Sequence, residues 1–366
     1  MIYLDSGATS LHKPNAVYRA VWDAMHSCAN PGRGGYRESR RAAEVLYNCR
    51  EQAGKLFGCL PEQVVLTTSC THGLNVAIRT LVKPGSTVVV SGFEHNAVTR
   101  PLHALGAHIR VAGRRLFDWE DTLNDFERQL EGADAAVVTH VSNVVGYILP
   151  VEQIASLCRE RGIPFILDAA QSSGSLPVSL EKLGADFIAM PGHKGLLGPQ
   201  GTGLLLCRGG GEPLFFGGTG SMSREQTMPV ELPDRLEAGT LNVPGYAGLA
   251  EGLRYLNQTG TEAVFRREHR LLQQCIRGLK QAGMQVFAGD HQAATVSFLP
   301  GQDCEEAAEF LGRQGIALRA GLHCAPYAHE SAGTLETGTV RVSIGYDTFS
   351  GQIAAFLRWA SKLPRF

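Results

Sequence analysis

Seven short apolar or β-branched runs, separated by helix-like segments, occupy the chain between about residues 60 and 210. Runs of this kind without polar alternation are typical of strands that are buried on both faces. The segments between them, such as 151–162, have helical spacing and end at glycine. This order predicts an α/β fold with a mostly parallel, doubly wound seven-stranded sheet flanked by helices. The expected strands are 64–68, 87–91, 108–112, 135–140, 164–168, 186–190 and 203–207.

A different pattern begins near residue 245. A long helical stretch is followed by alternating strand-like and helix-like segments, at 248–283, 294–300, 305–315 and 339–346. The chain of 366 residues is also long for a single domain. We therefore predict a large domain at 15–245 and a smaller α+β domain formed by 1–14 and 246–366.

The composition favours a globular protein with a small-molecule partner. Hydrophobic residues make up 44% of the chain and charged residues 19%, and the formal net charge is -1. This balance gives no electrostatic reason to expect nucleic acid or a membrane surface as a partner. No window approaches the roughly 20 apolar residues needed to cross a bilayer, so we expect a cytoplasmic protein.

The nine cysteines are scattered and contain no CxxC pair. This distribution indicates neither a disulfide framework nor a metal site. Most of them are expected to be small buried hydrophobic residues, the commonest role of a free cysteine.

Polar side chains follow five of the predicted strands, at the sheet edge where ligands of doubly wound folds bind. A helix start, "SCTHG", follows the first run and offers N–H groups to an anion. Taken singly, each feature has an ordinary structural explanation, such as a capped helix, a satisfied histidine or a surface lysine. The candidates are Thr71 and His72, His95, Asn143, Asp168 with Gln171, and His193 with Lys194.

Together these side chains complement pyridoxal phosphate. This cofactor needs a lysine for its aldehyde, an anion site for its phosphate and a carboxylate beside the pyridine nitrogen. It also uses a neutral donor to the ring hydroxyl and a flat ring stacked on the pyridine. Lys194, the "SCTHG" helix start, Asp168, Asn143 or Gln171, and His95 supply one of each.

At this point the sequence resembles the class V group of fold type I pyridoxal phosphate enzymes, specifically the cysteine desulfurase and selenocysteine lyase family. The resemblance covers nearly the whole chain, from "YLDSGATS" to "VRVSIGY". It is carried by "EHNAV", "HVSNVVG", "DAAQSSG", "DFIAMPGHKGLLGPQGTG", "RLEAGTLNVPG" and "LHCAP", which occur in the order of the family. Six such motifs in order form a specific signal.

The resemblance implies a role for each candidate residue. Lys194 would bind the cofactor covalently, Asp168 would pair with the pyridine nitrogen, and His95 would stack on the ring. Gln171 and Asn143 would contact the ring hydroxyl, and Asn143 also the substrate. Thr71, His72 and His193 would help to hold the phosphate. Thr219, in "FFGGTGS", would reach the phosphate of the other subunit in a homodimer.

The resemblance also implies the reaction. Arg341 matches the arginine that binds the substrate carboxylate, a task suited to a guanidinium group. Cys324, in "LHCAP", matches the nucleophilic cysteine that takes sulfur from L-cysteine, leaving L-alanine and an enzyme persulfide. The attacking group must be a thiolate, which His323, Arg319 or the cofactor could favour. A sulfur-acceptor protein, as in iron–sulfur cluster assembly, would then be a partner.

Two departures from the family and three alternatives remain open. Pro191 stands where many relatives have a phosphate-binding serine, and Cys70 replaces a usual threonine. The alternatives are a lyase for L-selenocysteine, another class V aminotransferase or epimerase, and a non-catalytic scaffold that keeps the fold. The departures place the phosphate contacts, more than Lys194, in question.

Overall fold

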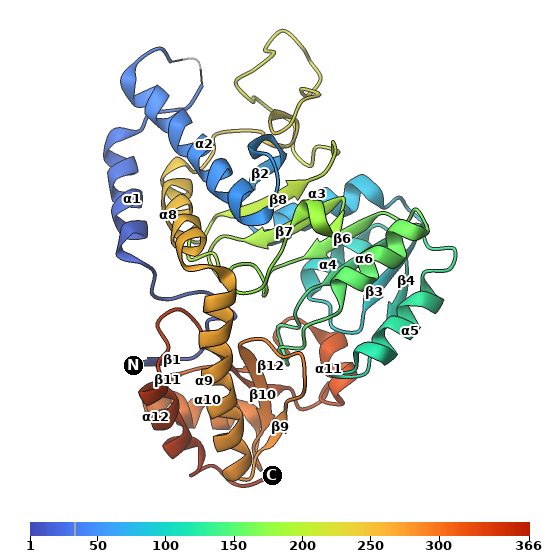
Figure 1. The fold of residues 1–366 in the computed structure, drawn as a ribbon, viewed down its shortest axis with the longest axis vertical. Helices are drawn as coiled ribbons and strands as arrows, with labels where there is room; N and C mark the ends of the chain where they lie inside the picture. The colour runs from blue at the N-terminus through green and yellow to red at the C-terminus, as the bar shows by residue number, and fades with distance from the viewer. Residues whose placement is uncertain (33) are drawn as a thin grey trace.

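The computed structural model describes residues 1–32 and 34–366. A seven-stranded sheet forms the centre of its upper part in Figure 1, and a four-stranded antiparallel sheet lies in its lower part. Both termini lie in this lower part (Figure 1). This arrangement confirms the predicted α/β class with a second, smaller sheet.

The seven-stranded sheet has the order β2-β8-β7-β6-β5-β3-β4. Strands β4, β3, β5, β6 and β7 run parallel to one another, whereas β8 runs antiparallel to both β7 and β2. Six of the strands are largely buried because their side chains are mainly apolar on both faces, whereas the edge strand β4 is mostly half-buried. Their bounds are Val64–Thr67 (β2), Thr87–Ser91 (β3), His108–Ala112 (β4), Ala135–Thr139 (β5), Phe165–Asp168 (β6), Phe187–Pro191 (β7) and Gly203–Cys207 (β8).

Helices cover both faces of this sheet. One face packs against α2, α5, α6, α7 and α8, and the other packs against α3 and α4. Helix α1 lies along α8 at the outer side (Figure 1). The bounds are Asn15–Ser27 (α1), Arg37–Phe57 (α2), Cys70–Leu81 (α3), Asn96–Ala104 (α4), Trp119–Gln129 (α5), Val151–Glu160 (α6), Leu180–Leu183 (α7) and Val243–Thr259 (α8), with short 3-10 turns at Pro61–Gln63 and Asp234–Leu236.

The four-stranded sheet has the order β12-β13-β10-β9 and its own hydrophobic core. Strand β1 pairs with β11 beside it, so the first residues of the chain lie against the last third. The bounds are Ile2–Tyr3 (β1), Gln285–Phe287 (β9), Thr295–Leu299 (β10), Ile316–Ala317 (β11), Arg319–Gly321 (β12), Thr339–Ser343 (β13), Thr261–Gln281 (α9), Cys304–Arg313 (α10), Pro326–Ala332 (α11) and Ser350–Ala360 (α12). The exact domain boundaries stay a prediction.

The long helical stretch expected at 248–283 is two helices in the structure. Helix α8 ends at Thr259 and α9 begins at Thr261, with Gly260 between them at a φ of 80°. A backbone of positive φ interrupts a right-handed helix, and glycine adopts it without steric cost. As a result α9 runs from the seven-stranded sheet down to the four-stranded sheet (Figure 1).

Candidate active site

The carboxyl ends of the strands bring most of the predicted residues into one pocket of about 100 Å³, here called the strand-end pocket. Parallel strands place the residues that follow them at the same edge of the sheet. The histidine, lysine and carboxylate side chains that line the pocket are those of His95, Asp168, His193 and Lys194. Other lining residues are Ser69, Cys70, Thr71, Thr139, Asn143, Gln171 and Pro191.

Lys194 lies three residues beyond β7, and burial lowers the pKa of its amine. Nearby Cys70 and Asp168 oppose this shift. Burial disfavours the ammonium form, so the site promotes the neutral amine that nucleophilic and proton-abstracting lysines need.

Asp168 is the last residue of β6 and is 2% exposed. Its Oδ1 accepts hydrogen bonds from the Ala170 N–H, at 2.9 Å, and from the Cys70 thiol, at 3.5 Å. Burial raises the pKa of the carboxyl group, and the Ala170 N–H and Lys194 oppose that rise. Asp168 is therefore held in one orientation by donors that favour its charged form.

His95 caps helix α4, where its Nδ1 accepts a hydrogen bond from the Ala97 N–H at 3.0 Å. Burial, with smaller effects from Lys194 and Arg341, lowers the pKa of His95 to about 4. The ring is therefore neutral at pH 7, with the proton on Nε2. A neutral planar ring of this kind suits stacking on a cofactor.

The N-terminus of α3 provides the predicted anion site. Ser69 caps this helix by accepting a hydrogen bond from the His72 N–H at 3.1 Å, and Thr71 lines the pocket. His193 also lines it, with Nδ1 3.0 Å from the Thr9 hydroxyl oxygen and a pKa lowered to about 4, first by burial and then by Lys194. Backbone N–H groups and the helix dipole favour an anion here.

Two predicted phosphate contacts lie outside the pocket lining. The His72 ring accepts a hydrogen bond from the Thr68 N–H and packs edge-on against Phe215. The Thr219 hydroxyl lies 3.0 Å from that of Ser221 in the loop between β8 and α8. A role for Thr219 across a subunit boundary stays a prediction.

Arg341, in β13 of the small sheet, is 3% exposed and contacts the pocket-lining residue Asn143. One guanidinium nitrogen donates to the Asn143 carbonyl at 3.0 Å, and another donates to Asp5 Oδ1 at 2.8 Å. Asp5 also binds Arg319, at 3.0 Å. Asp5 is thus a positioning residue that the sequence interpretation did not assign, although it stands directly after the first apolar residues.

The loop that carries Cys324 is anchored at the strand ends by its backbone. The Asn143 side chain donates to the His323 carbonyl at 2.7 Å, and the Asn96 N–H donates to the Cys324 carbonyl at 2.7 Å. Both His323 and Cys324 have a positive φ, of 50° and 57°, a backbone form that non-glycine residues adopt at a cost. The Cys324 side chain is exposed, whereas most of the other cysteines are buried.

The structure argues against His323 as the source of a positive charge for the Cys324 thiolate. His323 is buried, its Nε2 lies 3.1 Å from the Thr339 carbonyl, and its pKa is lowered to about 2, first by burial and then by Arg341. A neutral ring cannot stabilise a thiolate by charge. Arg319, whose guanidinium group binds Asp5, remains a cation of the same region.

The pocket fits pyridoxal phosphate. Among residues 1–32 and 34–366, Asn143 Oδ1 and Arg341 Nε are buried polar atoms without a hydrogen-bond partner, and both belong to residues beside the pocket. Buried polar atoms without partners are rare, and a bound ligand is one explanation for them beside a pocket. The fold places a lysine, an acid, a histidine and a helix N-terminus at one edge of the sheet. Together these features define a candidate pyridoxal phosphate protein.

Comparisons with known proteins give the family. The model of class V aminotransferases matches residues 2–356. The chain is 32% identical to a probable cysteine desulfurase of Methanothermobacter thermautotrophicus, covering 96% of this chain and 92% of that relative. It is 33% identical to a probable cysteine desulfurase of Aeropyrum pernix, covering 90% and 86%. The chain belongs to the class V aminotransferase family, whose members use pyridoxal phosphate.

Solved structures agree. An apo cysteine desulfurase from Thermococcus onnurineus NA1 superposes with a TM-score of 0.90 at 31% identity, covering 99% of this chain and 94% of that one. A cysteine desulfurase from Escherichia coli superposes with a TM-score of 0.85 at 25% identity, covering 99% of this chain and 94% of that one.

Within the described residues, no helix is long and apolar enough to span a membrane.

Proposed function

We propose that this protein is a pyridoxal phosphate-dependent cysteine desulfurase that forms L-alanine and a persulfide on Cys324. The observation that carries the proposal is the exposed Cys324, on a strained loop anchored to Asn96 and Asn143 at the edge that holds Lys194. The named relatives and solved neighbours support the same reaction.

Arg341, Lys194 and Cys324 have separate roles in this reaction. Arg341, whose Nε is unpartnered, binds the substrate carboxylate, and the neutral Lys194 amine removes the proton from the α-carbon. The bound cofactor supplies the electron sink for the charge left on that carbon. The Cys324 thiolate attacks the substrate sulfur and forms the sulfur–sulfur bond, and the carbon–sulfur bond breaks with its electron pair staying on the β-carbon, which takes up a proton. The proton that Lys194 removed returns to the α-carbon, which completes L-alanine.

The cofactor would be held by the strand-end pocket. Lys194 would provide the amine for its aldehyde, Asp168 would pair with its ring nitrogen, and the start of α3 with Thr71 would hold its phosphate. Gln171 is held in place by a 3.0 Å hydrogen bond from its Nε2 to the Gly7 carbonyl, which leaves its Oε1 for the cofactor. These assignments follow from the chemistry of each group and its place on the pocket wall.

Replacement of Cys324 by alanine tests the reaction. The variant should lose at least about 100-fold in alanine formation from L-cysteine, because Cys324 is exposed, whereas the pocket cysteine Cys70 is buried and burial raises the pKa of its thiol. Cys28→Ala is the matched control, because Cys28 is half-buried and does not line the strand-end pocket. This variant should keep full activity. Sulfide and alanine are measured together under single-turnover conditions. Undiminished alanine formation by Cys324→Ala would contradict the persulfide route.

We further propose a homodimer that acts in the cytoplasm and passes sulfur to an acceptor protein. Phe216, Trp22 and Met25 are exposed by 77%, 61% and 69%, and large apolar side chains at the surface favour burial by a partner. The free cysteines suit a reducing compartment. Light scattering on the purified protein gives the subunit number, and a monomer at micromolar concentration would exclude the dimer.

A further inference from the structure

A second cavity meets the strand-end pocket at Lys194. It has a volume of about 110 Å³ and is here called the α9 cavity, because helix α9 forms one of its walls. Its other walls come from the segment after β1, the loops after β6 and β7, helix α8, and the ends of β10 and β13. The two cavities share Val141, Ala170, Gln171 and Lys194.

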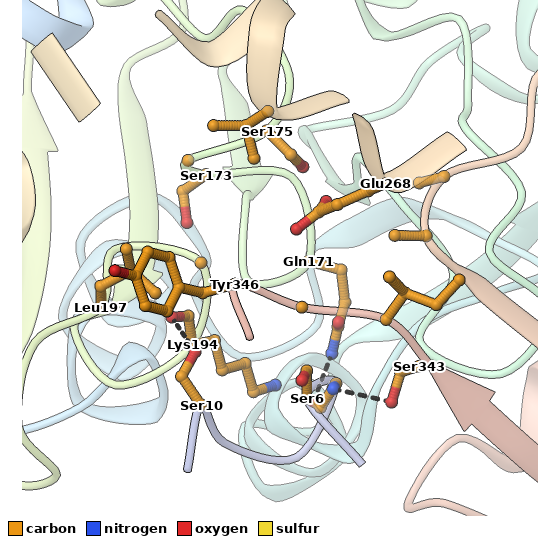
Figure 2. Close-up of a pocket in the computed structure, with 18 of the residues that line it drawn as sticks. Ser6, Ser10, Gln171, Ser173, Ser175, Lys194, Leu197, Glu268, Ser343 and Tyr346 are labelled. Atoms are coloured by element: carbon orange, nitrogen blue, oxygen red, sulfur yellow. Dashed lines mark hydrogen bonds between the residues drawn. The ribbon is translucent and has the colours of Figure 1, made fainter. Parts of the chain in front are cut away.

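Glu268 of α9 points its carboxyl group into this cavity (Figure 2). Glu268 is 8% exposed. Within residues 1–32 and 34–366, its carboxyl group forms no hydrogen bond or ion pair. The Ser173 hydroxyl, also drawn in Figure 2, is buried and has no partner either. Two polar groups without protein partners in one cavity leave hydrogen-bonding capacity that water can fill.

No cationic side chain forms an ion pair with the Glu268 carboxyl group within residues 1–32 and 34–366. The neighbouring Arg267 directs its guanidinium group to the carbonyls of Tyr346, at 2.7 Å, and Thr348, at 2.6 Å. The titratable groups that line the cavity are Glu268, Arg267 and Lys194, together with the phenols of Tyr255 and Tyr346. Arg267 opposes the effect of burial on Glu268, which nevertheless raises the pKa of this carboxyl group to about 8.

Lys194 needs a proton acceptor, and the strand-end pocket offers poor ones. His95 and His193 both have a pKa lowered to about 4, so neither holds a proton near pH 7. Asp168 accepts hydrogen bonds and is reserved for the cofactor nitrogen. The α9 cavity has ample room for water, since one water needs only about 10–15 Å³. Figure 2 shows the Lys194 side chain entering it from the side opposite Glu268.

We propose that Glu268 exchanges a proton with the Lys194 amine through water held in the α9 cavity. In this exchange the Lys194 ammonium group gives a proton to a water molecule, and water gives a proton to the Glu268 carboxylate. An ammonium and a carboxylate become a neutral amine and a neutral carboxyl group, so the total charge of the cavity is unchanged. Burial disfavours the charged form of both groups, which drives the exchange in this direction.

Uptake of pyridoxal phosphate by the apo-protein tests the exchange, because bond formation to the aldehyde requires a neutral Lys194 amine. The wild-type rate, followed by visible absorbance, should rise with pH through about 8, where Glu268 becomes able to accept a proton. Glu268→Gln should lose this inflection and take up the cofactor about tenfold more slowly at pH 8.5. Its equilibrium affinity should change less than twofold.

A chemical rescue makes the test specific to proton transfer. Glu268→Ala opens space for formate, and formate should accelerate uptake by this variant several-fold in a saturable manner, with no effect on Glu268→Gln. Glu262→Gln is the matched control, because Glu262 lies on the same helix in an exposed ion pair with Arg266. A wild-type pH profile in Glu268→Gln, or no response of Glu268→Ala to formate, would overturn the exchange.

The inference rests on the proposed function for the importance of Lys194. Cofactor uptake, however, involves neither L-cysteine nor Cys324. A failed rescue with normal persulfide formation would therefore reject only the role of Glu268. A normal rescue with no loss in Cys324→Ala would reject only the desulfurase reaction.

Discussion

Two buried carboxyl groups flank Lys194 in different surroundings. Asp168, in the strand-end pocket, accepts a backbone N–H at 2.9 Å and a thiol at 3.5 Å. Glu268, in the α9 cavity, has no such donor within residues 1–32 and 34–366. Burial raises the pKa of both acids, but the donors around Asp168 oppose the rise. The difference teaches that hydrogen-bond donors can oppose the effect of burial on one buried acid while a second acid, on the other side of the same lysine, lacks them.

This difference separates their tasks. A charged Asp168 can pair with a protonated ring nitrogen, whereas an acid that takes up its proton near pH 8 can exchange it with a buried amine. Lys194 lines both cavities and so connects the two. Variants that alter one acid should leave the properties set by the other unchanged.

The largest expected effect is on stability, in Glu268→Gln. The unfolded chain loses the Glu268 proton near pH 4.5, whereas the folded protein keeps it up to about pH 8. The folded state therefore binds more protons between these values, and wild-type stability falls as pH rises through them. Relative to the wild type, Glu268→Gln should gain about 4 kcal/mol between pH 5 and pH 9, because the two states differ by about three pKa units over this range and each unit corresponds to ~1.4 kcal/mol.

Urea unfolding of the apo-protein at pH 5, 7 and 9 measures this gain. Glu262→Gln should show no pH-dependent difference from the wild type, because its ion pair with Arg266 is exposed. Parallel unfolding free energies for wild type and Glu268→Gln over this range would mean that Glu268 is solvated, and the contrast with Asp168 would disappear.

The two cavities also differ in how far the sequence predicts them. Lys194, Asp168, Asn143 and His95 each follow a buried strand, and parallel strands end at one edge, so their meeting can be derived from apolar runs alone. The predicted strands agree with the structure to within one residue at nearly every end. Family resemblance then supplied roles that spacing could not.

The α9 cavity could not be derived in this way, because its walls come from segments that are remote in the sequence. Ser6, Glu268 and Tyr346 meet only when the two sheets dock. One local signal was present. Glu268 falls at helical spacing with the buried Leu271, Leu272 and Cys275, which places an acid on the apolar face of α9. A charged acid in such a position is costly unless it is paired or takes up a proton, so its presence on this face was a signal.

The next effect is on substrate binding, in Asp5→Asn. Asp5 joins the buried Arg341 to the exposed Arg319, at 2.8 Å and 3.0 Å. Loss of its charge frees Arg341 to change orientation, so the KM for L-cysteine should rise about tenfold while kcat changes less than twofold. Uptake of the cofactor, which depends on Lys194, should keep its wild-type pH profile.

Steady-state kinetics of Asp5→Asn and of Asp347→Asn check this expectation. Asp347 forms a surface pair with His12 and is the matched control. A lower KM in Asp5→Asn would show that Asp5 competes with the substrate carboxylate for Arg341 instead of positioning it. A shifted pH profile of cofactor uptake would show that the two cavities are not separate in function.

The smallest effect is expected in Cys70→Thr, which strengthens the support of Asp168. Cys70 stands at the first turn of α3, and its thiol is a weak donor to Asp168 Oδ1. A threonine hydroxyl is a stronger donor and fits a shorter hydrogen bond, so it should favour the charged form of Asp168. We expect the dissociation constant for pyridoxal phosphate to fall about threefold, a gain of ~0.6 kcal/mol in binding free energy.

Cys28→Thr serves as the control for this variant. In Cys70→Thr the Glu268-dependent inflection in the rate of cofactor uptake should stay near pH 8. Weaker cofactor binding in Cys70→Thr would mean that the shape of the pocket requires the thiol. The hydrogen-bond donors around Asp168 would then not be what distinguishes Asp168 from Glu268.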